Sequence, residues 1–151
     1  MFKQVIRDQY RSKLDQLFDL NRVVRPKEGW IRTLRKALGM SSPQLAERLA
    51  VSKSQASQME RMEVDDRITL KQLRRVADAL DCDLVYALVP RRSIDDMVRD
   101  RARAKASKLV ARADVHMKLE AQPLSSKQLQ AQVDAEVERL WREMPRDLWE
   151  D

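Results

Sequence analysis

Residues 32–61 read RTLRKALGMSSPQLAERLAVSKSQASQMER, and this stretch decides which fold we expect. It contains two capping boxes, Ser41-Ser42-Pro43-Gln44 and Ser52-Lys53-Ser54-Gln55, in which a hydroxyl and an amide three residues later close the start of a helix. A third box, Thr69-Leu70-Lys71-Gln72, follows. The boxes predict helices that end near Leu49, Arg61 and Leu80, after a helix over 30–38 that Gly39 terminates.

The first two boxes open a pair of helices with the features of a helix-turn-helix unit, in which one helix braces a second at a fixed angle. The turn between them is Ala50-Val51-Ser52, and small or apolar residues stand where the helices must cross, namely Leu45, Ala46, Leu49, Ala56 and Met59. The second helix has a polar face, to which its N-terminus adds N–H groups and partial positive charge. A major-groove contact would use these side chains: Lys53, Ser54, Ser57 and Gln58. A solvated helix surface is the alternative interpretation of this face.

Base reading and phosphate binding are expected to fall to different residues. Gln58 carries an amide that can pair bidentately with adenine, whereas Lys53 can reach either a guanine or a phosphate. The expected phosphate contacts are cations before the first helix of the pattern and around the fourth: Arg25, Lys27, Arg67, Lys71 and Arg74.

Apolar spacing predicts the organisation of the rest of the chain, which we expect to be mainly α. Residues 1–25 form an N-terminal amphipathic helix that ends near Asn21. Residues 26–90 form the helix-turn-helix domain, and residues 91–151 form a helical extension for dimerisation or partner binding. This extension contains a long helix over 94–119, with an apolar stripe of Ile94, Val98, Ala102, Leu109 and Ala113, and a last helix that opens at Ser125.

The run Leu84-Val85-Tyr86-Ala87-Leu88-Val89 is apolar, rich in β-forming residues and closed by Pro90. We interpret it as a short strand, with a buried helical extension as the alternative. An isolated strand leaves its edge unpaired, so we expect Leu84–Val89 to pair with a second copy and form the interface of a homodimer. A twofold pair also suits DNA, because one helix-turn-helix reads only about 4–5 base pairs.

Composition narrows the classes of function. The chain has 151 residues, 30 Lys and Arg against 24 Asp and Glu, and only 2 Gly, which favours helices over a turn-rich β fold. With one cysteine, Cys82, and one histidine, His116, we expect no disulfide, no metal site and no cofactor. Nothing orients a nucleophile toward His116, so we expect a protein that is not an enzyme. We also expect no signal peptide, no membrane span and a cytoplasmic location.

The second half of the chain has a basic part followed by an acidic part. Residues 91–121 carry 9 basic and 5 acidic side chains, whereas residues 122–151 carry 4 and 7. We expect Trp141 to pack internally and Trp149 to be the better candidate for a partner contact. The acidic segment and Trp149 support an alternative to specific DNA binding. In this alternative the protein is an interaction module that neutralises a partner without specific DNA binding.

Residues 30–80 resemble the lambda-repressor/Cro-like (Xre) helix-turn-helix family. The stretch 32–61 matches the family's pattern, with Leu-Ala on the second helix and Glu near the end of the third. The resemblance implies a five-helix-type repressor/Cro-like core and a partly buried ion pair between Arg35 and Glu60. The chain departs from the family at Ala50 and near Met62, where the family often has Gly. The resemblance also implies positions that face bases or phosphates, with Ser42 at the phosphate-binding start of the second helix, followed by Ser52, Lys53, Ser54, Ser57 and Gln58.

A longer resemblance connects the chain with the bacterial family labelled mobile mystery protein A. It rests on PKEGWIRTLRKALGMS (26–41), ITLKQLRRVADALDCDLVYALVP (68–90) and HMKLEAQ (116–122), which occur in the same order and spacing. That family is similar to antitoxins and is typically encoded beside mobile mystery protein B, a Fic-domain protein. The resemblance therefore implies a sequence-specific repressor that binds a double-stranded DNA operator and has a Fic-domain partner. A Fic-inhibiting helix of the Ser/Thr-x-x-x-Glu-Gly/Asn kind is not visible in the sequence.

Overall fold

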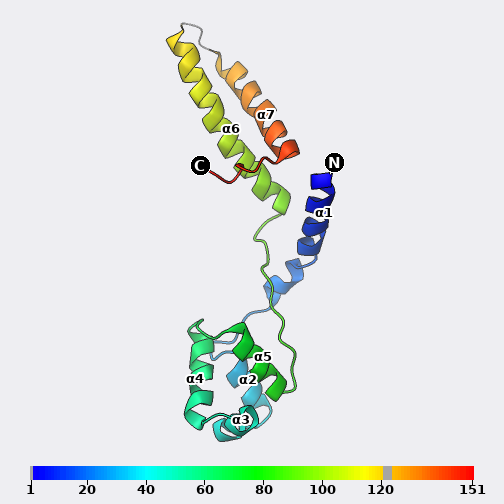
Figure 1. Ribbon diagram of the computed structural model, residues 1–151, viewed down its shortest axis with the longest axis vertical. Coiled ribbons are helices and arrows are strands. Elements are labelled where there is room, and N and C mark those ends of the chain that lie inside the picture. The colour runs from blue at the N-terminus through cyan, green and yellow to red at the C-terminus, as the bar shows by residue number, and fades with distance from the viewer. Residues whose placement is uncertain (1, 121–123) are drawn as a thin grey trace. The chain divides into compact units, whose positions relative to one another are not determined.

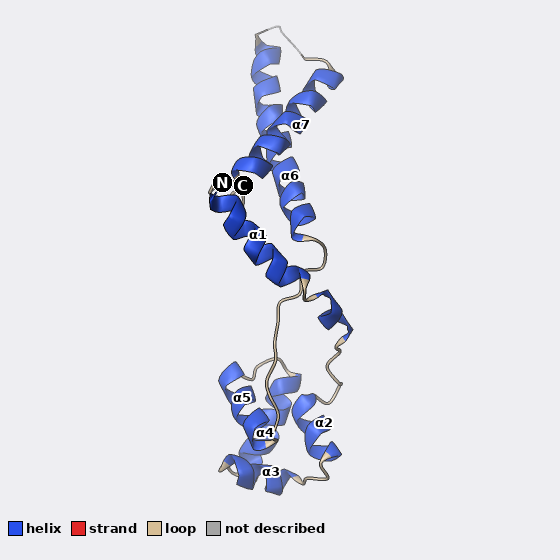
Figure 2. Ribbon diagram, turned by 90° about the vertical axis from the view of Figure 1, so that its right-hand side faces the viewer, coloured by secondary structure: helices blue, strands red, loops and turns tan. Residues whose placement is uncertain are grey.

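The computed structural model describes residues 2–120 and 124–151, which divide into two compact units. The central unit is Leu17–Val89, and the terminal unit combines Met1–Gln16 with Pro90–Asp151. The regular elements of the described residues are all helices, of which α1 to α7 are labelled in Figure 1, and Figure 2 shows no strand among them. The mainly α fold class is therefore confirmed. The segment 1–25, expected to form one helical element, is divided between the two units.

The central unit holds η1 (Phe18–Arg22), α2 (Trp30–Ala37), α3 (Ser42–Leu49), α4 (Lys53–Val64) and α5 (Leu70–Ala79). All three predicted capping boxes are confirmed at the starts of α3, α4 and α5. In each box the N-cap hydroxyl accepts the backbone N–H three residues on and the amide side chain accepts the N-cap N–H, at 2.8 to 3.3 Å. The apolar sides of the helices meet in one core of Ile31, Leu45, Leu49, Met59, Val76 and Leu80.

Helices α2 to α5 each end in a left-handed turn that returns N–H groups to the last carbonyls of the helix. At the end of α3, for example, the N–H of Val51 donates to the carbonyl of Ala46 at 3.0 Å. Glycine has no steric cost in this conformation, but it fills only one of the four turns. The left-handed residues are Gly39, Ala50, Asp66 and Asp81, with φ between 54° and 64°.

Helix α2 has no capping side chain of its own, because its N-cap residue is Gly29. The carboxylate of Glu63, in the last turn of α4, accepts the N–H of Trp30 at 2.9 Å and that of Ile31 at 3.3 Å. Gly29 has a φ of 85°, and a Cβ atom there would lie 2.0 Å from Oε2 of Glu63. This close approach requires glycine at position 29. The carboxylate at the end of α4 thus caps the start of α2.

The strand expected over residues 84–89 is not formed in the described chain. This segment has neither helical nor strand structure, and Val85, Tyr86 and Leu88 are 76%, 62% and 89% exposed. A strand needs a neighbour to pair its N–H and C=O groups, and the central unit contains no strand that could pair with it. The helical alternative is not formed either, because α5 ends at Ala79 and Asp81 turns left-handed.

The terminal unit holds α1 (Phe2–Asp15), α6 (Ile94–Leu119) and α7 (Ser126–Glu143). Helices α6 and α7 lie side by side and run in opposite directions (Figure 1) around a core of Val98, Ala102, Ala106, Val137, Leu140 and Leu148. The apolar stripe predicted on α6 is correct as far as Ala102 but wrong beyond it. Leu109 and Ala113 are exposed, because the buried residues of α6 continue at a spacing of four through Ala106 and Val110, and a spacing of four moves the contact line by about 40° around the helix at each step.

Trp141 packs against the core of the terminal unit, as predicted. The guanidinium groups of Arg7 and Arg99 lie 4.8 Å and 4.4 Å from the centre of its ring, which attaches α1 to this side of the hairpin. Trp149, by contrast, is 60% exposed. None of the helices in the described part of the chain has the length and apolar character needed to cross a bilayer.

Candidate nucleic-acid interface

Helices α3 and α4 cross in the way that the sequence predicts. All five residues expected at the crossing are buried, and Leu45 and Ala56 are the least exposed, at 0% and 1%. The left-handed Ala50 reverses the chain between the helices in three residues. The packed crossing fixes the angle of α4, so its outer side is presented on a rigid support.

The outer side of α4 carries five polar or cationic side chains, which we call the α4 polar face. At 100° per residue they fall within an arc of about 140°, opposite the buried Ala56, Met59 and Glu63. Four of the five are exposed and Ser57 is half-buried. The α4 polar face consists of Lys53, Ser54, Ser57, Gln58 and Arg61.

Arg61 is a member of this face that the sequence analysis did not include, because the predicted helix ended there. The helix in fact continues to Val64, which places Arg61 one turn after Ser57 and two turns after Lys53. Its guanidinium has no ion-pair partner in the described part of the chain. The i, i+4, i+8 spacing of Lys53, Ser57 and Arg61 is the sequence pattern that could have identified it.

The N-terminus of α4 offers backbone donors beside this face. The capping box uses the N–H groups of Ser52 and Gln55, while those of Lys53 and Ser54 have no partner among the described residues. The Ser52 hydroxyl oxygen already accepts a hydrogen bond, so this residue could still donate its hydroxyl proton. Free N–H groups at a helix start favour an anion there.

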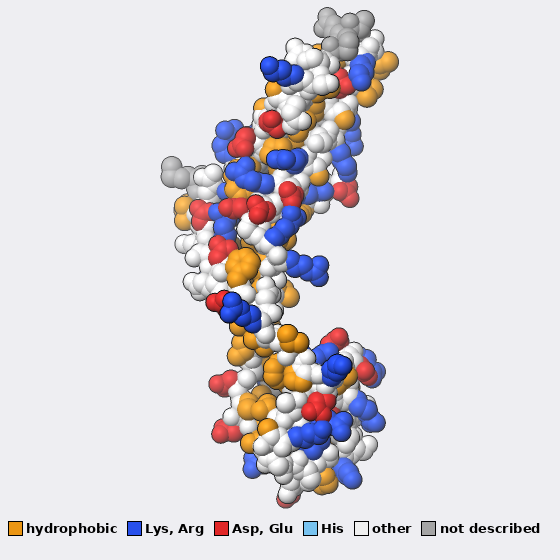
Figure 3. Space-filling view, turned by 180° about the vertical axis from the view of Figure 1, so that it is seen from behind, with side chains coloured by type: hydrophobic (Ala, Val, Ile, Leu, Met, Phe, Trp, Pro, Cys, Tyr) orange, Lys and Arg blue, Asp and Glu red, His pale blue; other side chains and the backbone are white. Residues whose placement is uncertain are grey.

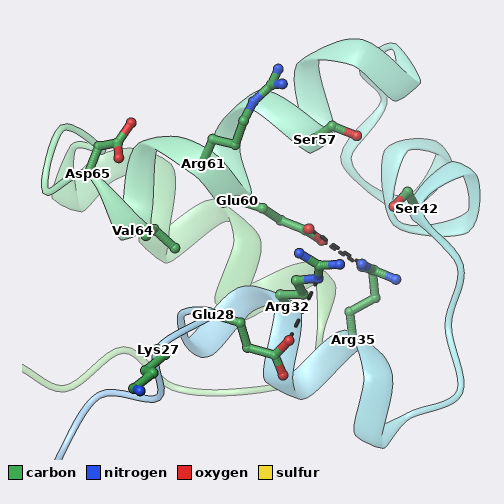
Figure 4. Close-up of a pocket in the computed structure, with 10 residues that line it drawn as sticks. All are labelled: Lys27, Glu28, Arg32, Arg35, Ser42, Ser57, Glu60, Arg61, Val64 and Asp65. Atoms are coloured by element: carbon green, nitrogen blue, oxygen red, sulfur yellow. Dashed lines mark hydrogen bonds and ion pairs between the residues drawn. The ribbon is translucent and has the colours of Figure 1, made fainter.

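An open groove of about 540 Å³ runs beside the α4 polar face (Figure 4). Ser42, in the first turn of α3, and Ser57, on α4, point toward each other across it (Figure 4). Below them, Nε of Arg35 lies 2.5 Å from Oε1 of Glu60, and both side chains are about nine-tenths buried. The structure thus brings Ser42 next to α4. The charge-assisted ion pair of Arg35 and Glu60 forms the floor of the groove.

The rim of the groove carries charges of both signs. The hydrogen bond from Lys36 lowers the pKa of Glu28, so this carboxylate stays ionised at neutral pH. Lys27 lies at the same rim and has no ion-pair partner in the described residues (Figure 4). Elsewhere, the face of the molecule in Figure 3 shows Lys and Arg side chains interspersed with acidic ones over both units.

The expected phosphate contacts differ in how far the fold already uses them. Arg25 donates to the carbonyl of Glu63 at 2.9 Å and pairs with Asp66 at 2.6 Å, so it caps the end of α4. Arg67 lies 3.2 Å from Asp65. The guanidinium of Arg74 is 6.0 Å from the ring centre of Tyr86. Lys27, Lys53 and Lys71 have no ion-pair partner within the described ranges, so their charges are available to an anion.

Comparison with protein families matches residues 31–86, which run from the second residue of α2 to beyond the end of α5, to the helix-turn-helix family HTH_3. Residues 31–86 form an Xre-like helix-turn-helix domain. The HTH_3 domain covers every residue of the α4 polar face, and it is a DNA-binding, regulatory kind of domain rather than a catalytic one. No curated protein and no solved structure matches the chain.

Proposed function

We propose that the protein is a sequence-specific transcriptional repressor that reads its operator with the α4 polar face. The observation that carries the proposal is that these five side chains, four of them exposed, lie on the outer side of a helix that α3 braces, within residues 31–86 of the HTH_3 match. Such a helix can enter the major groove and present its amide and hydroxyl groups to base edges. The chain resembles a bacterial family, and in bacteria the chromosome lies in the cytoplasm. A regulator that binds its operator there is therefore proposed to be cytoplasmic.

Base reading is assigned to Gln58, and phosphate binding to Ser42, Ser52 and Lys71, with Lys27, Arg67 and Arg74 as further contacts. Lys53, Ser54 and Ser57 can serve either purpose, because they stand near the helix start where bases and backbone are both in reach. Arg25 binds DNA only with a guanidinium N–H that its contacts to Glu63 and Asp66 leave unused.

The test is binding of the full chain to the DNA upstream of its own gene and to a random duplex of equal length. Gln58→Ala should weaken operator binding by about 1–3 kcal/mol and leave random-sequence affinity unchanged. Gln132→Ala, an exposed glutamine on α7, is the matched control. The assignment of α4 is wrong if Gln58→Ala and Lys53→Ala combined leave operator affinity intact. Parent protein that binds neither duplex would favour the protein-interaction alternative.

We propose that the operator is bound by a homodimer, joined through Leu84–Val89. The unpaired backbone of this segment and the exposure of Val85, Tyr86 and Leu88 support pairing with the same segment of a second copy. Two copies would read half-sites about 34 Å apart. Sedimentation velocity at tens of micromolar should show a dimer, and Leu88→Lys should convert it to a monomer. A parent monomer at that concentration would overturn the interface.

We propose an antitoxin-like role toward a Fic-domain protein encoded beside it. This proposal rests on the resemblance of residues 26–41, 68–90 and 116–122 to mobile mystery protein A, and the exposed Trp149 supports a partner contact. Co-expression with the neighbouring Fic-domain protein should give a complex that survives purification, and Trp149→Ala should weaken it. Separate elution of the two proteins would refute this role.

A further inference from the structure

A row of four cations follows one side of α6 in the terminal unit. Their spacing of four, three and four residues keeps them on one helix face, over a rise of about 16 Å. We call this row the basic stripe, and it consists of Arg101, Lys105, Lys108 and Arg112. Because like charges on one face repel each other, such a row favours an anionic partner.

Residues 145–151, the acidic strap, turn back from the end of α7 and lie against α6 (Figure 1). Arg101 donates to the carbonyls of Leu148 at 2.7 Å and Glu150 at 2.6 Å, and lies 3.2 Å from a carboxylate oxygen of Asp151. Lys105 donates to the carbonyl of Asp147 and lies 3.0 Å from its carboxylate. Every group that the strap offers the stripe in these contacts is an oxygen acceptor.

The strap is firmly anchored at one point and loosely held at its carboxylates. Leu148 is 1% exposed and belongs to the core of the terminal unit. The side chains of Asp147 and Asp151 are 58% and 86% exposed, although they pair with the stripe. Exposed ion pairs contribute little to stability, so the carboxylates can leave the stripe while Leu148 stays in place.

The basic stripe extends beyond the strap. Lys108 reaches only Asp151, at 3.9 Å, and its side chain is 59% exposed. Arg112 is exposed and has no ion-pair partner in the part of the chain that the structure describes. A cleft of about 200 Å³ lies where the stripe faces the strap, so anionic oxygens can approach these cations.

We propose that the basic stripe binds phosphate groups of double-stranded DNA, and that the acidic strap occupies the stripe when DNA is absent. The inference rests on the proposed DNA-binding function. DNA carries one negative charge per about 1.7 Å of its axis and releases counterions when cations bind, so it outcompetes a few exposed carboxylates at low salt. The tethered strap is always at high local concentration, and it therefore suppresses non-specific binding through the stripe.

The experiment measures binding of the full chain to a labelled random-sequence 20-base-pair duplex at 50 and 200 mM salt. The strap variant is D147N/E150Q/D151N. The control, D15N/D19N/D134N, makes the same change in net charge at exposed aspartates that form no ion pair with the stripe. Each additional phosphate contact makes the loss of affinity between the two salt concentrations about 3.5-fold larger. The release of Lys105 and Lys108, the two lysines that pair with Asp147 and Asp151, should therefore give the strap variant about a 12-fold larger loss than the control.

Two further variants make the result decisive. K105Q/K108Q added to the strap variant removes the two lysines that pair with Asp147 and Asp151, and it should therefore remove the gain. In protein with an unaltered strap, saturating random DNA should shift the indole NMR resonance of Trp149, and K108Q/R112Q should prevent the shift. Equal salt dependence of strap variant and control, or an unmoved Trp149 resonance, would overturn the inference. These measurements use random DNA alone, so they test the stripe and not sequence specificity. Equal binding of operator and random DNA would refute the proposed sequence-specific function instead of this inference.

Discussion

Replacing Glu63 by alanine should destabilise the central unit far more than an ordinary surface substitution. The change removes the acceptor for the N–H groups of Trp30 and Ile31, of which the second is buried and out of reach of water. Hydrogen bonds to charged groups contribute about 1.5–3 kcal/mol each, but the 3.3 Å bond is long. We therefore expect a loss of about 2–4 kcal/mol. For a unit of this size that corresponds to about 10–25 °C in Tm.

The assay combines urea denaturation with amide hydrogen exchange, which reports on Trp30 and Ile31 individually. Glu28→Ala is the control, since it removes an exposed carboxylate from the same helix start without removing the cap, and it should leave both readouts nearly unchanged. Gly29→Ala should be severely destabilising in the parent and less so beside Glu63→Ala, because the clash with the carboxylate is then gone. Unaltered exchange at Ile31 in Glu63→Ala would refute the reasoning.

Three other predictions follow from named contacts. Glu60→Ala strands the buried guanidinium of Arg35 and should cost about 3–5 kcal/mol in thermal unfolding, and an unchanged Tm would contradict the pairing. Ala50→Gly relieves a left-handed alanine and should stabilise by about 0.5–1 kcal/mol in urea, whereas a lower midpoint would show no strain there. The hydrogen bond from Lys105 lowers the pKa of Asp147, so this contact is retained above the ordinary aspartate pKa and lost as pH falls through the lowered one. NMR titration of Asp147 should show a midpoint below the ordinary aspartate pKa, and Lys105→Met should raise that midpoint. The same midpoint in the parent and in Lys105→Met would contradict the contact.

The parts of the fold that sequence reasoning predicts are those whose chemistry is local. The starts of α3, α4 and α5 follow from Ser41, Ser52 and Thr69, because each cap is completed three residues later. The polar face of α4 follows in the same way, from helical spacing beside small residues at the crossing. Arg61 was missed only because nothing in the sequence marked where α4 ends, and Met62-Glu63-Val64 in fact continues the helix.

The parts that could not be predicted depend on residues far apart in the chain or on a partner. The cap of α2 joins Trp30 to Glu63 across 33 residues, and no local pattern identifies that pair. The apolar run Leu84–Val89 has strand composition, but composition alone cannot provide a neighbouring strand. The stripe on α6 was misplaced after Ala102, because a straight helix face leads on to Leu109, whereas the packing against α7 follows a spacing of four residues and buries Ala106 and Val110.

The long-range cap of α2 also imposes an order on folding. Helices α3, α4 and α5 each carry a complete start signal within one turn, so these starts can form before any distant contact exists. The first turn of α2 must wait until the chain between Gly29 and Glu63 has closed and the last turn of α4 has formed. The transition state for folding should therefore contain α3 and α4 with α2 still frayed, and α2 should be the first of the helices α2 to α5 to open again in the native protein.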